Sequence, residues 1–570
     1  MQLGDLIQAA RGEVEADLLL KNSQVVNVFS GDIHRVNVAI SRSRIVGLGD
    51  YRAEKEIDLD GMYLCPGFID GHVHIESSMV RVAEFARAVV PNGTTSVIID
   101  PHEIANVLGL DGIRYMLESS KYNPLSVFVM LPSCVPATNL ETSGATLQSW
   151  DLSPLLHEKW VVGLGEVMNY PGVLFRDPQV LAKIDAASGK RIDGHAPGLS
   201  GRDLCAYVAA GIGSDHECTT LEEAREKLRL GMYIMIREGT IARNLEALLP
   251  LVTPANARRC MFVTDDRHPA ELLYEGHINS IIKKAIGLGL DPIIAIQMAT
   301  INPARYFGLT DKEGIAPGRQ ADLVVFDNFK DFNIRMVFRN GVMVARDGKI
   351  LPHVTIPPDI PVRGSMNVNW GSHSDFHIHA EGSRAKVIGV IPDQIVTEAL
   401  VEEIKVENGL AVADTERDIL KLAVVERHLA SGNIGLGFVK GFGLKRGALA
   451  SSVAHDSHNL IVLGTNDEDM MVAARQVIQM GGGLAAASEG AVLASLPLPI
   501  AGLMSRDSVE SVNSQMQRLL AVARELGSSL HDPFMSLSFL SLPVIPALKL
   551  TDRGLVDVTQ FKFVPLFERD

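Results

Sequence analysis

Near the start of the chain, the hydrophobic strand of Gly67-Phe68-Ile69-Asp70-Gly71-His72-Val73-His74-Ile75-Glu76-Ser77-Ser78 ends in two histidines one residue apart. Side chains alternate across a strand, so His72 and His74 point to one side while Val73 points to the other. Two imidazoles on one side of a strand suit a shared metal ion. The pair alone does not separate a metal site from an ordinary surface or core strand.

After His74 the chain alternates strand-like runs, glycine or proline turns and helical stretches, the order expected of a parallel α/β sheet. Counting the strand that ends at His74, eight strands are predicted. Eight successive βα units match the ~250 residues typical of a (β/α)8 barrel. The predicted strands are 68–73, 96–100, 126–131, 161–167, 191–194, 211–215, 232–236 and 260–264.

The predicted fold class is α/β: a (β/α)8 TIM-like barrel with a flanking small β-sandwich domain and an additional C-terminal α+β domain. A chain of 570 residues is too long for one ordinary domain. Short alternating strands precede the barrel and return after it, and the proline-rich residues 352–361 read as a linker. The predicted segments are 1–66 (N-terminal part of the β-sandwich), 67–312 (barrel), 313–352 (return strands of the β-sandwich) and 362–570 (C-terminal domain).

The composition favours a globular protein that acts on small molecules. Hydrophobic residues make up 46% and charged residues 21%, which excludes disorder as the main theme. A net charge of −15 without long basic runs argues against a nucleic-acid partner. Five scattered cysteines indicate neither disulfides nor a thiolate zinc site. With no signal-peptide pattern and no run near the ~18 apolar residues of a membrane span, we expect a cytoplasmic protein that does not enter a membrane.

Metal-binding side chains also follow other predicted strands, at the end where barrel enzymes carry their chemistry. A lone Asp or His at a strand end is more often a capping residue, but chance seldom places six such residues together. Four histidines and two carboxylates exceed what one metal with an open position requires, and they fit two metals bridged by a carboxylate and a water. Glu166 is the expected bridge. The predicted ligands are His72, His74, Glu166, His195, His216 and Asp265.

With these motifs the chain resembles the amidohydrolase superfamily and, within it, the bacterial adenine deaminases, over essentially its whole length. The second strand, for example, runs into Asp100-Pro101-His102-Glu103-Ile104, a stretch similar to that family's pattern. Further resembling stretches are 66–78, 133–137, 165–173, 193–199, 216–217, 235–239 and 264–267 in the barrel, and 452–459, 481–483 and 541–550 in the C-terminal domain.

The fourth strand departs from the wider superfamily. Many binuclear relatives bridge their metals there with a carboxylated lysine, whereas this chain has Glu166. That difference follows the adenine deaminase pattern and argues against a dihydroorotase or hydantoinase. A histidine and carboxylate site accommodates manganese, iron or zinc, and the resemblance favours manganese or iron. We expect a homodimer.

The resemblance implies hydrolytic deamination of adenine to hypoxanthine and ammonia, a purine salvage reaction. Metal coordination lowers the pKa of water from ~15.7 towards ~7, which gives a hydroxide that can attack the purine C6. Asp265 would take its proton and pass it to the leaving amine. Glu217, directly after a ligand, is the first choice to protonate N1, and His102 is the alternative; both can instead support the ligands.

Two other functions stay open from the sequence. The pocket residues choose the substituent, so the chain can be a deaminase of a related or N6-substituted aminopurine. It can also be a non-catalytic amidohydrolase-like scaffold, which the intact ligand set argues against. The C-terminal cluster His455-Asp456-Ser457-His458 either closes over the barrel mouth, holds an accessory metal or forms a structural network.

Overall fold

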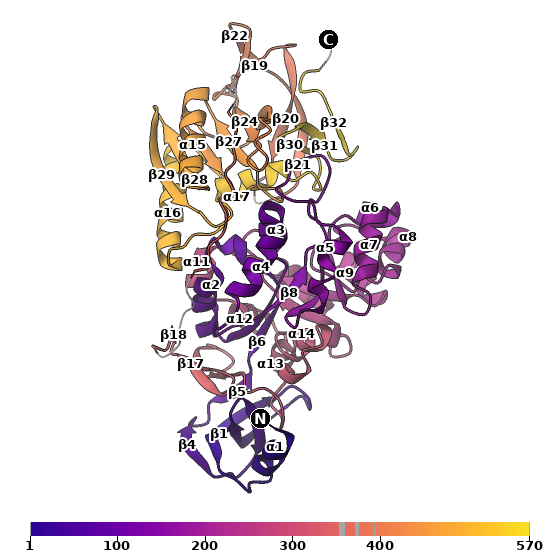
Figure 1. Cartoon of the computed structure of the whole chain (residues 1–570), viewed down its shortest axis with the longest axis vertical. Helices are drawn as coiled ribbons and strands as arrows, with labels where there is room; N and C mark the ends of the chain where they lie inside the picture. Colours follow the sequence, from indigo (N-terminus) through magenta and orange to yellow (C-terminus); the bar gives the residue numbers. More distant parts are fainter. Residues whose placement is uncertain (1, 353–358, 371–375, 393, 569–570) are drawn as a thin grey trace.

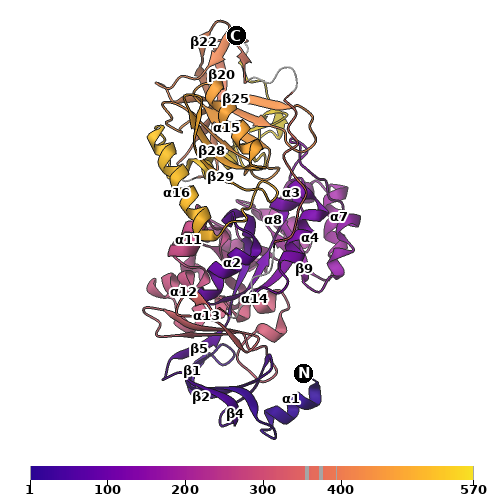
Figure 2. The same cartoon turned by 60° about the vertical axis from the view of Figure 1, so that its left-hand side comes forward.

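The chain forms three parts stacked along one long axis (Figure 1). The computed structural model describes residues 2–352, 359–370, 376–392 and 394–568, so residues 353–358 of the predicted linker lie outside the described residues. A β-rich part carries the N-terminus, a barrel with its helices lies in the middle, and a second β-rich part carries the C-terminus. Figure 2 shows the same order from another side.

The N-terminal part is a sheet of nine strands drawn from both sides of the barrel sequence. Strand β5 (Tyr63–Pro66) pairs antiparallel with β15 (Leu323–Phe326), with Cys65 opposite Val324. The chain therefore enters and leaves the barrel through adjacent strands. The remaining strands are β1 (Ala16–Asn27), β2 (Asp32–Ser41), β3 (Arg44–Leu48), β4 (Ala53–Asp58), β16 (Ile334–Arg339), β17 (Val342–Arg346) and β18 (Lys349–Ile350), and helix α1 (Leu3–Ala10) precedes them.

The middle part is the predicted barrel of parallel strands, and the predicted fold class is confirmed. Its strands are β6 (Phe68–His74), β7 (Thr94–Ile99), β8 (Ser126–Leu131), β9 (Val161–Val167), β10 (Arg191–Gly194), β11 (Ser214–Asp215), β12 (Tyr233–Arg237), β13 (Cys260–Val263) and the short β14 (Asp265–Asp266). Strands β6 to β10 pair in sequence order, and β11 to β13 form a second run. Because β14 pairs with β6, the end of the eighth strand lies beside the first, with Asp265 opposite Val73.

Buried side chains cover both faces of the barrel strands, as a sheet enclosed by helices requires. Every residue of β6, β7 and β8 is buried. Asp70 is a buried carboxylate inside β6 that accepts a hydrogen bond from Thr264 Oγ1 at 2.5 Å, which ties the first strand to the last. The longer surrounding helices are α2 (Val82–Val89), α3 (His102–Leu108), α4 (Leu110–Ser119), α7 (Pro178–Ala186), α8 (Gly201–Ala209), α9 (Leu221–Arg229), α12 (Ile278–Gly287), α13 (Pro292–Met298) and α14 (Ile301–Tyr306).

The C-terminal part is the predicted additional domain, built on an eight-stranded sheet that helix α15 (Asp467–Gln479) packs against. Its sheet contains β20 (Arg384–Val390), β21 (Thr397–Glu403), β24 (Ile419–Val425), β25 (Ile434–Lys440), β26 (Ala448–Ser451), β27 (Leu460–Gly464), β28 (Gly483–Ser488) and β29 (Ala491–Pro497). Helices α16 (Val509–Glu525) and α17 (Pro533–Ser538) and strands β30 (Leu548–Thr551) and β31 (Gly554–Asp557) also belong to it. The domain lies over the end of the barrel that carries α3 (Figures 1 and 2).

The predictions about membrane spans and cysteines can be compared with the described residues. Among them, no helix is long and apolar enough to cross a membrane. All five cysteines are free thiols, and Cys205 is the exposed one. The division at residues 66, 312 and 362 stays a prediction.

Candidate metal centre and active site

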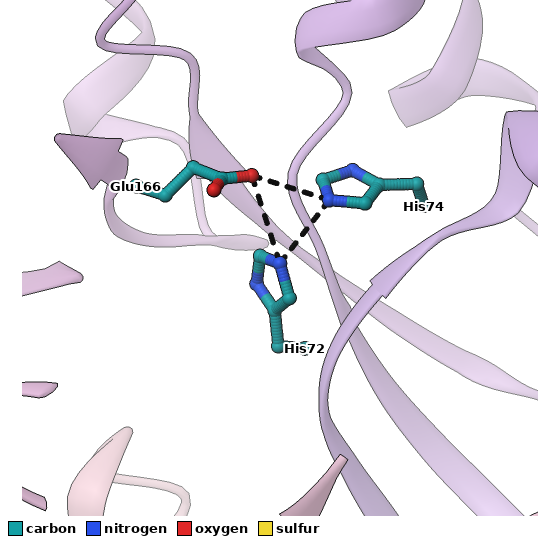
Figure 3. Close-up of side chains that lie close together, drawn as sticks. All are labelled: His72, His74 and Glu166. Atoms are coloured by element: carbon teal, nitrogen blue, oxygen red, sulfur yellow. Dashed lines mark hydrogen bonds and ion pairs between the residues drawn. The ribbon is translucent and has the colours of Figure 1, made fainter. Parts of the chain in front are cut away.

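The six predicted ligands converge at the carboxyl ends of the barrel strands. His72 and His74 leave the end of β6 on the same side, and their Nε2 atoms lie 3.1 Å apart. Glu166, from β9, points between them, with Oε1 3.2 Å from His74 Nε2 and 3.7 Å from His72 Nε2 (Figure 3). Although β6 and β9 lie three strands apart in the sheet, the side chains of His72, His74 and Glu166 meet in one small volume.

The second carboxylate oxygen of Glu166 faces the other two histidines. Its Oε2 lies 2.6 Å from His195 Nδ1 and 3.3 Å from His216 Nε2. Asp265 completes the set, with Oδ1 3.4 Å from His72 Nε2 and 3.2 Å from His74 Nε2. Two groups of donor atoms therefore lie on opposite oxygens of Glu166, and this arrangement suits two cations bridged by one carboxylate.

The hydrogen bonds behind the histidines support a cation at this place. His74 Nδ1 lies 2.8 Å from the carbonyl oxygen of Asp100, so Nδ1 carries the proton and Nε2 presents a lone pair to the centre. That lone pair faces a second imidazole nitrogen and two carboxylates. The backbone N–H of Glu166 donates to Asp100 Oδ2 at 2.9 Å, which fixes the strand end that carries the bridge. Facing acceptors of this kind require positive charge between them.

Glu217 and His102, the two predicted proton donors, border the same centre. Glu217 Oε1 lies 3.4 Å from His216 Nε2, and its carboxylate is held by Arg237. Burial raises the pKa of Glu217, but the charges of Arg237, His195 and His216 together outweigh burial and the net pKa is lowered. Glu217 is therefore ionised at rest. His102 Nδ1 lies 3.5 Å from Glu166 Oε1 and has no hydrogen-bond partner within the described ranges.

Arg237 is a site residue to which the sequence assigned no role. It ends β12, and the carboxylate that follows it, Glu238, accepts a hydrogen bond from Lys284 Nζ at 3.0 Å, so this strand end contributes none of the predicted metal ligands. Its Nη1 donates to Asp265 Oδ2 at 2.5 Å. Its position could have indicated a role, because a residue at the carboxyl end of a barrel strand lies on the same face of the barrel as the ligands.

The cavity above the ligands is closed by the C-terminal domain, including residues 455–456 of the cluster for which closure of the barrel mouth was one of three predicted alternatives. The barrel contributes Met168, Ile241 and Ala242 together with five of the six predicted ligands, His74, Glu166, His195, His216 and Asp265. The C-terminal domain contributes Ile395, His455, Asp456, Met535, Phe539, Leu542 and Ile545. The walls opposite the ligands are thus mostly apolar, which suits a flat aromatic molecule with a few polar edges.

A parallel barrel with histidines and carboxylates gathered at its strand ends defines the class of amidohydrolases. The pattern of the amidohydrolase family matches residues 63–344, which include the whole ligand set. Membership of this class implies the use of a divalent metal, and the buried groups described above offer the donor atoms for one.

Comparison with relatives over the full length of the chain identifies one family within the amidohydrolases. The adenine deaminase C-terminal domain matches residues 394–562. The chain is 56% identical over 565 residues to the adenine deaminase of Desulfatibacillum aliphaticivorans, covering 99% of each chain. It is 53% identical to adenine deaminase 2 of Carboxydothermus hydrogenoformans, covering 99% of each, and 53% identical to the adenine deaminase of Methanothrix thermoacetophila, covering 100% of each. The chain belongs to the adenine deaminase family and is a hydrolytic enzyme, as the resemblance predicted.

Proposed function

We propose that this enzyme hydrolyses adenine to hypoxanthine and ammonia and so serves purine salvage. The observation that carries the proposal is the identity of 56% over 99% of both chains with an adenine deaminase. The buried ligand set and the apolar cavity beside it support the same reaction. A scaffold without catalysis is not favoured, because a binding protein has no need for six buried ligand groups in one place.

Two divalent cations would be held by His72, His74, Glu166, His195, His216 and Asp265, with manganese or iron ahead of zinc. His72, His74 and Asp265 lie on one side of the Glu166 carboxylate, and His195 and His216 lie on the other. When bound, the cations supply a water of lowered pKa as the nucleophile.

The remaining chemistry belongs to side chains. Asp265 Oδ1 faces the centre while Oδ2 is fixed by Arg237, so Oδ1 takes the proton of the attacking water and passes it to the amino group, which leaves as ammonia. Glu217 protonates N1. Because Glu217 starts ionised, it first takes a proton from solvent water, and the proton lost from the C6 hydroxyl as the carbonyl forms returns to it. His102 is the alternative donor. The C-terminal domain excludes bulk water from the cavity.

The test is a spectrophotometric screen of aminopurines with metal-defined protein. Adenine should give hypoxanthine and one ammonia per turnover, and N6-methyladenine should react more slowly. A screen in which no aminopurine releases ammonia would overturn the proposal, and faster turnover of N6-methyladenine would move it to an N6-substituted substrate. Cytoplasmic location, a homodimer and the lack of a nucleic-acid or membrane partner stay predictions.

A further inference from the structure

A loop of the C-terminal domain reaches into the cavity over the metal centre and brings a carboxylate with it. Asp456 is 2% exposed and lines that cavity. Its Oδ2 has no hydrogen-bond partner within the part of the chain that the structure describes, and its Oδ1 lies 3.9 Å from His102 Nε2, beyond hydrogen-bond distance. A buried carboxylate without a hydrogen-bond donor is energetically unfavourable. A ligand in this cavity can supply the missing donor.

The loop is held in place by Glu103 of α3, the residue after His102. Glu103 Oε1 accepts a hydrogen bond from His455 Nδ1 at 2.6 Å, and Oε2 accepts one from His458 Nε2. Burial raises the pKa of Glu103, but the neighbouring histidines outweigh burial and the net pKa is lowered. An ionised barrel carboxylate therefore fastens two histidines that flank Asp456 in the sequence. We call Glu103, His455 and His458 the interdomain clamp.

The clamp is a hydrogen-bonded cluster and not an accessory metal site. The backbone N–H of Ala454 donates to His458 Nδ1 at 3.1 Å, so that nitrogen carries the lone pair and the proton is on Nε2. Nε2 donates this proton to Glu103. A metal on Nε2 would require a proton on Nδ1, where the Ala454 N–H already points. The clamp therefore positions the loop that carries Asp456.

The rest of the C-terminal wall offers few polar groups besides Asp456. Among the residues that this domain contributes to the cavity, His455 and Asp456 are the polar ones. His455 Nδ1 is engaged by Glu103, and its ring stacks on Phe539 with centroids 4.6 Å apart. A purine with its six-membered ring at the metal centre turns its imidazole ring, which carries one N–H, away from the barrel.

We propose that Asp456 is a substrate-recognition residue that accepts the imidazole-ring N–H of the purine and so selects the free base over N9-substituted purines. The proposal rests on the proposed function of the same cavity. A hydrogen bond to a buried carboxylate is stronger than one between neutral groups, and a ligand without the N–H leaves the carboxylate unpaired. The enzyme then discriminates against N9-substituted purines through the lost hydrogen bond as well as through steric exclusion.

The first test uses wild-type enzyme and needs no turnover. Purine and 9-methylpurine differ in the N–H, and calorimetry should show purine binding about 10- to 100-fold more tightly, the range for a hydrogen bond to a charged group. Equal affinities would overturn the role of Asp456 while leaving adenine deamination untouched. Failure of the aminopurine screen with this binding difference intact would overturn the proposed reaction alone.

The second test is the ratio of kcat/KM for adenine to kcat/KM for 9-methyladenine. Asp456→Ala should lower this ratio about 10-fold or more, and Asp456→Asn, which keeps an acceptor, should retain part of it. Ser457→Ala, which alters the neighbouring buried hydroxyl, serves as the matched control and should leave the ratio within about 3-fold. A ratio unchanged in both Asp456 variants, or equal losses on both substrates, would contradict the proposal.

The clamp is tested as a positioning device. His458→Ala removes one hydrogen bond to Glu103 and leaves Asp456 in the chain, so the ratio should fall in the same direction while metal content stays unchanged. Loss of metal in this variant, or an unchanged ratio, would overturn the positioning role.

Discussion

Arg237 and Glu217 form a two-point ion pair inside the barrel mouth. Arg237 Nη2 donates to Glu217 Oε2 at 3.0 Å, and Nη1 donates to Oε1. Each residue is 5% exposed. Since Nη1 also reaches Asp265, one guanidinium fixes both carboxylates to which proton transfer is assigned, and its charge keeps them ionised.

Replacing Arg237 should therefore impair catalysis and stability together. Arg237→Met leaves two buried carboxylates facing each other, so we expect a loss of about 3–5 kcal/mol in unfolding free energy and a drop in kcat of about 100-fold or more. Arg237→Lys keeps the charge without the fork and should be intermediate. Denaturant unfolding and steady-state kinetics measure the two effects. Full activity of Arg237→Lys would show that the two-point geometry is unnecessary.

The two carboxylates themselves should separate chemistry from metal binding. Asp265→Asn cannot accept a proton, so turnover should fall by roughly 10²–10⁴ or more. Glu217→Gln should also lower turnover while both metals stay bound. Metal content and rate must be measured on the same samples. If Glu217→Gln turns over at a near-normal rate, N1 protonation moves to His102 or water, and if it loses metal, Glu217 supports the ligands.

The bridge predicts the metal stoichiometry. Glu166 is the only one of the six predicted ligands with an oxygen facing each group of histidines, so Glu166→Ala should reduce loading from two divalent ions per chain. Elemental analysis of reconstituted protein measures this loading. Fewer than one ion per wild-type chain, or unchanged loading in the variant, would exclude a binuclear centre.

Lys227 offers a stability test directly behind the metal centre, because its partners Asp215 and Ala196 adjoin the predicted ligands His216 and His195. It is fully buried on α9, and its Nζ donates to Asp215 Oδ2 at 3.0 Å, Glu223 Oε1 at 2.8 Å and the Ala196 carbonyl at 2.7 Å. Lys227→Met strands a buried carboxylate, so we expect a loss of about 3–5 kcal/mol. The exposed Lys121, paired with Glu118, is the control, and Lys121→Met should cost less than about 1 kcal/mol. Similar losses in both variants would refute the argument.

An ion pair between the barrel and the C-terminal domain should make the free energy of unfolding depend on pH. His268 Nδ1 of the barrel lies 3.3 Å from Asp532 Oδ2 of the C-terminal domain. Burial lowers the pKa of His268, but its hydrogen bond and ion pair with Asp532 outweigh burial, and the net pKa is raised above 6.5. Burial raises the pKa of Asp532, but His268 outweighs it, and the net pKa is lowered below 3.8.

A raised histidine pKa gives stability that is complete below pH 6.5 and is lost as the pH rises through the folded value, whereas the aspartate contribution is lost below pH 3.8. Asp532→Asn keeps the cap on Met535 and removes the charge. The Tm difference between wild type and this variant should be largest near pH 5–6 and shrink at higher pH. A difference that stays constant from pH 5 to pH 9 would contradict this assignment.

The barrel was predictable because its signals are local. Strands β8, β9 and β10 have the predicted bounds, and the clearest signal is that of β8, an apolar run that ends before Pro132. Their carboxyl ends then share one edge by geometry, so Glu166 and Asp265 were placed together without any contact information. Strand β11 is shorter than predicted, because Gly211 has a φ of +97° and turns the chain before Ser214.

The contacts that complete the cavity had a weaker signal, because closure of the barrel mouth was only one of three predicted alternatives for residues 455–458. His455 meets Glu103 across 352 positions, and spacing in the sequence says nothing about which loop of a second domain docks on a barrel. Asp456 looked like one polar residue in a histidine-rich turn. Only its burial beside the ligands gives it a role.

The long separation within the clamp also sets an order in time. At ~5–20 residues per second, a ribosome needs ~10–40 s after Asp265 to reach His458, so the barrel emerges well before the loop that covers it. During that interval the newborn chain already contains every predicted ligand but nothing that closes over them. The chain can therefore bind metal ions before the loop that carries the substrate-recognition residue has been synthesised.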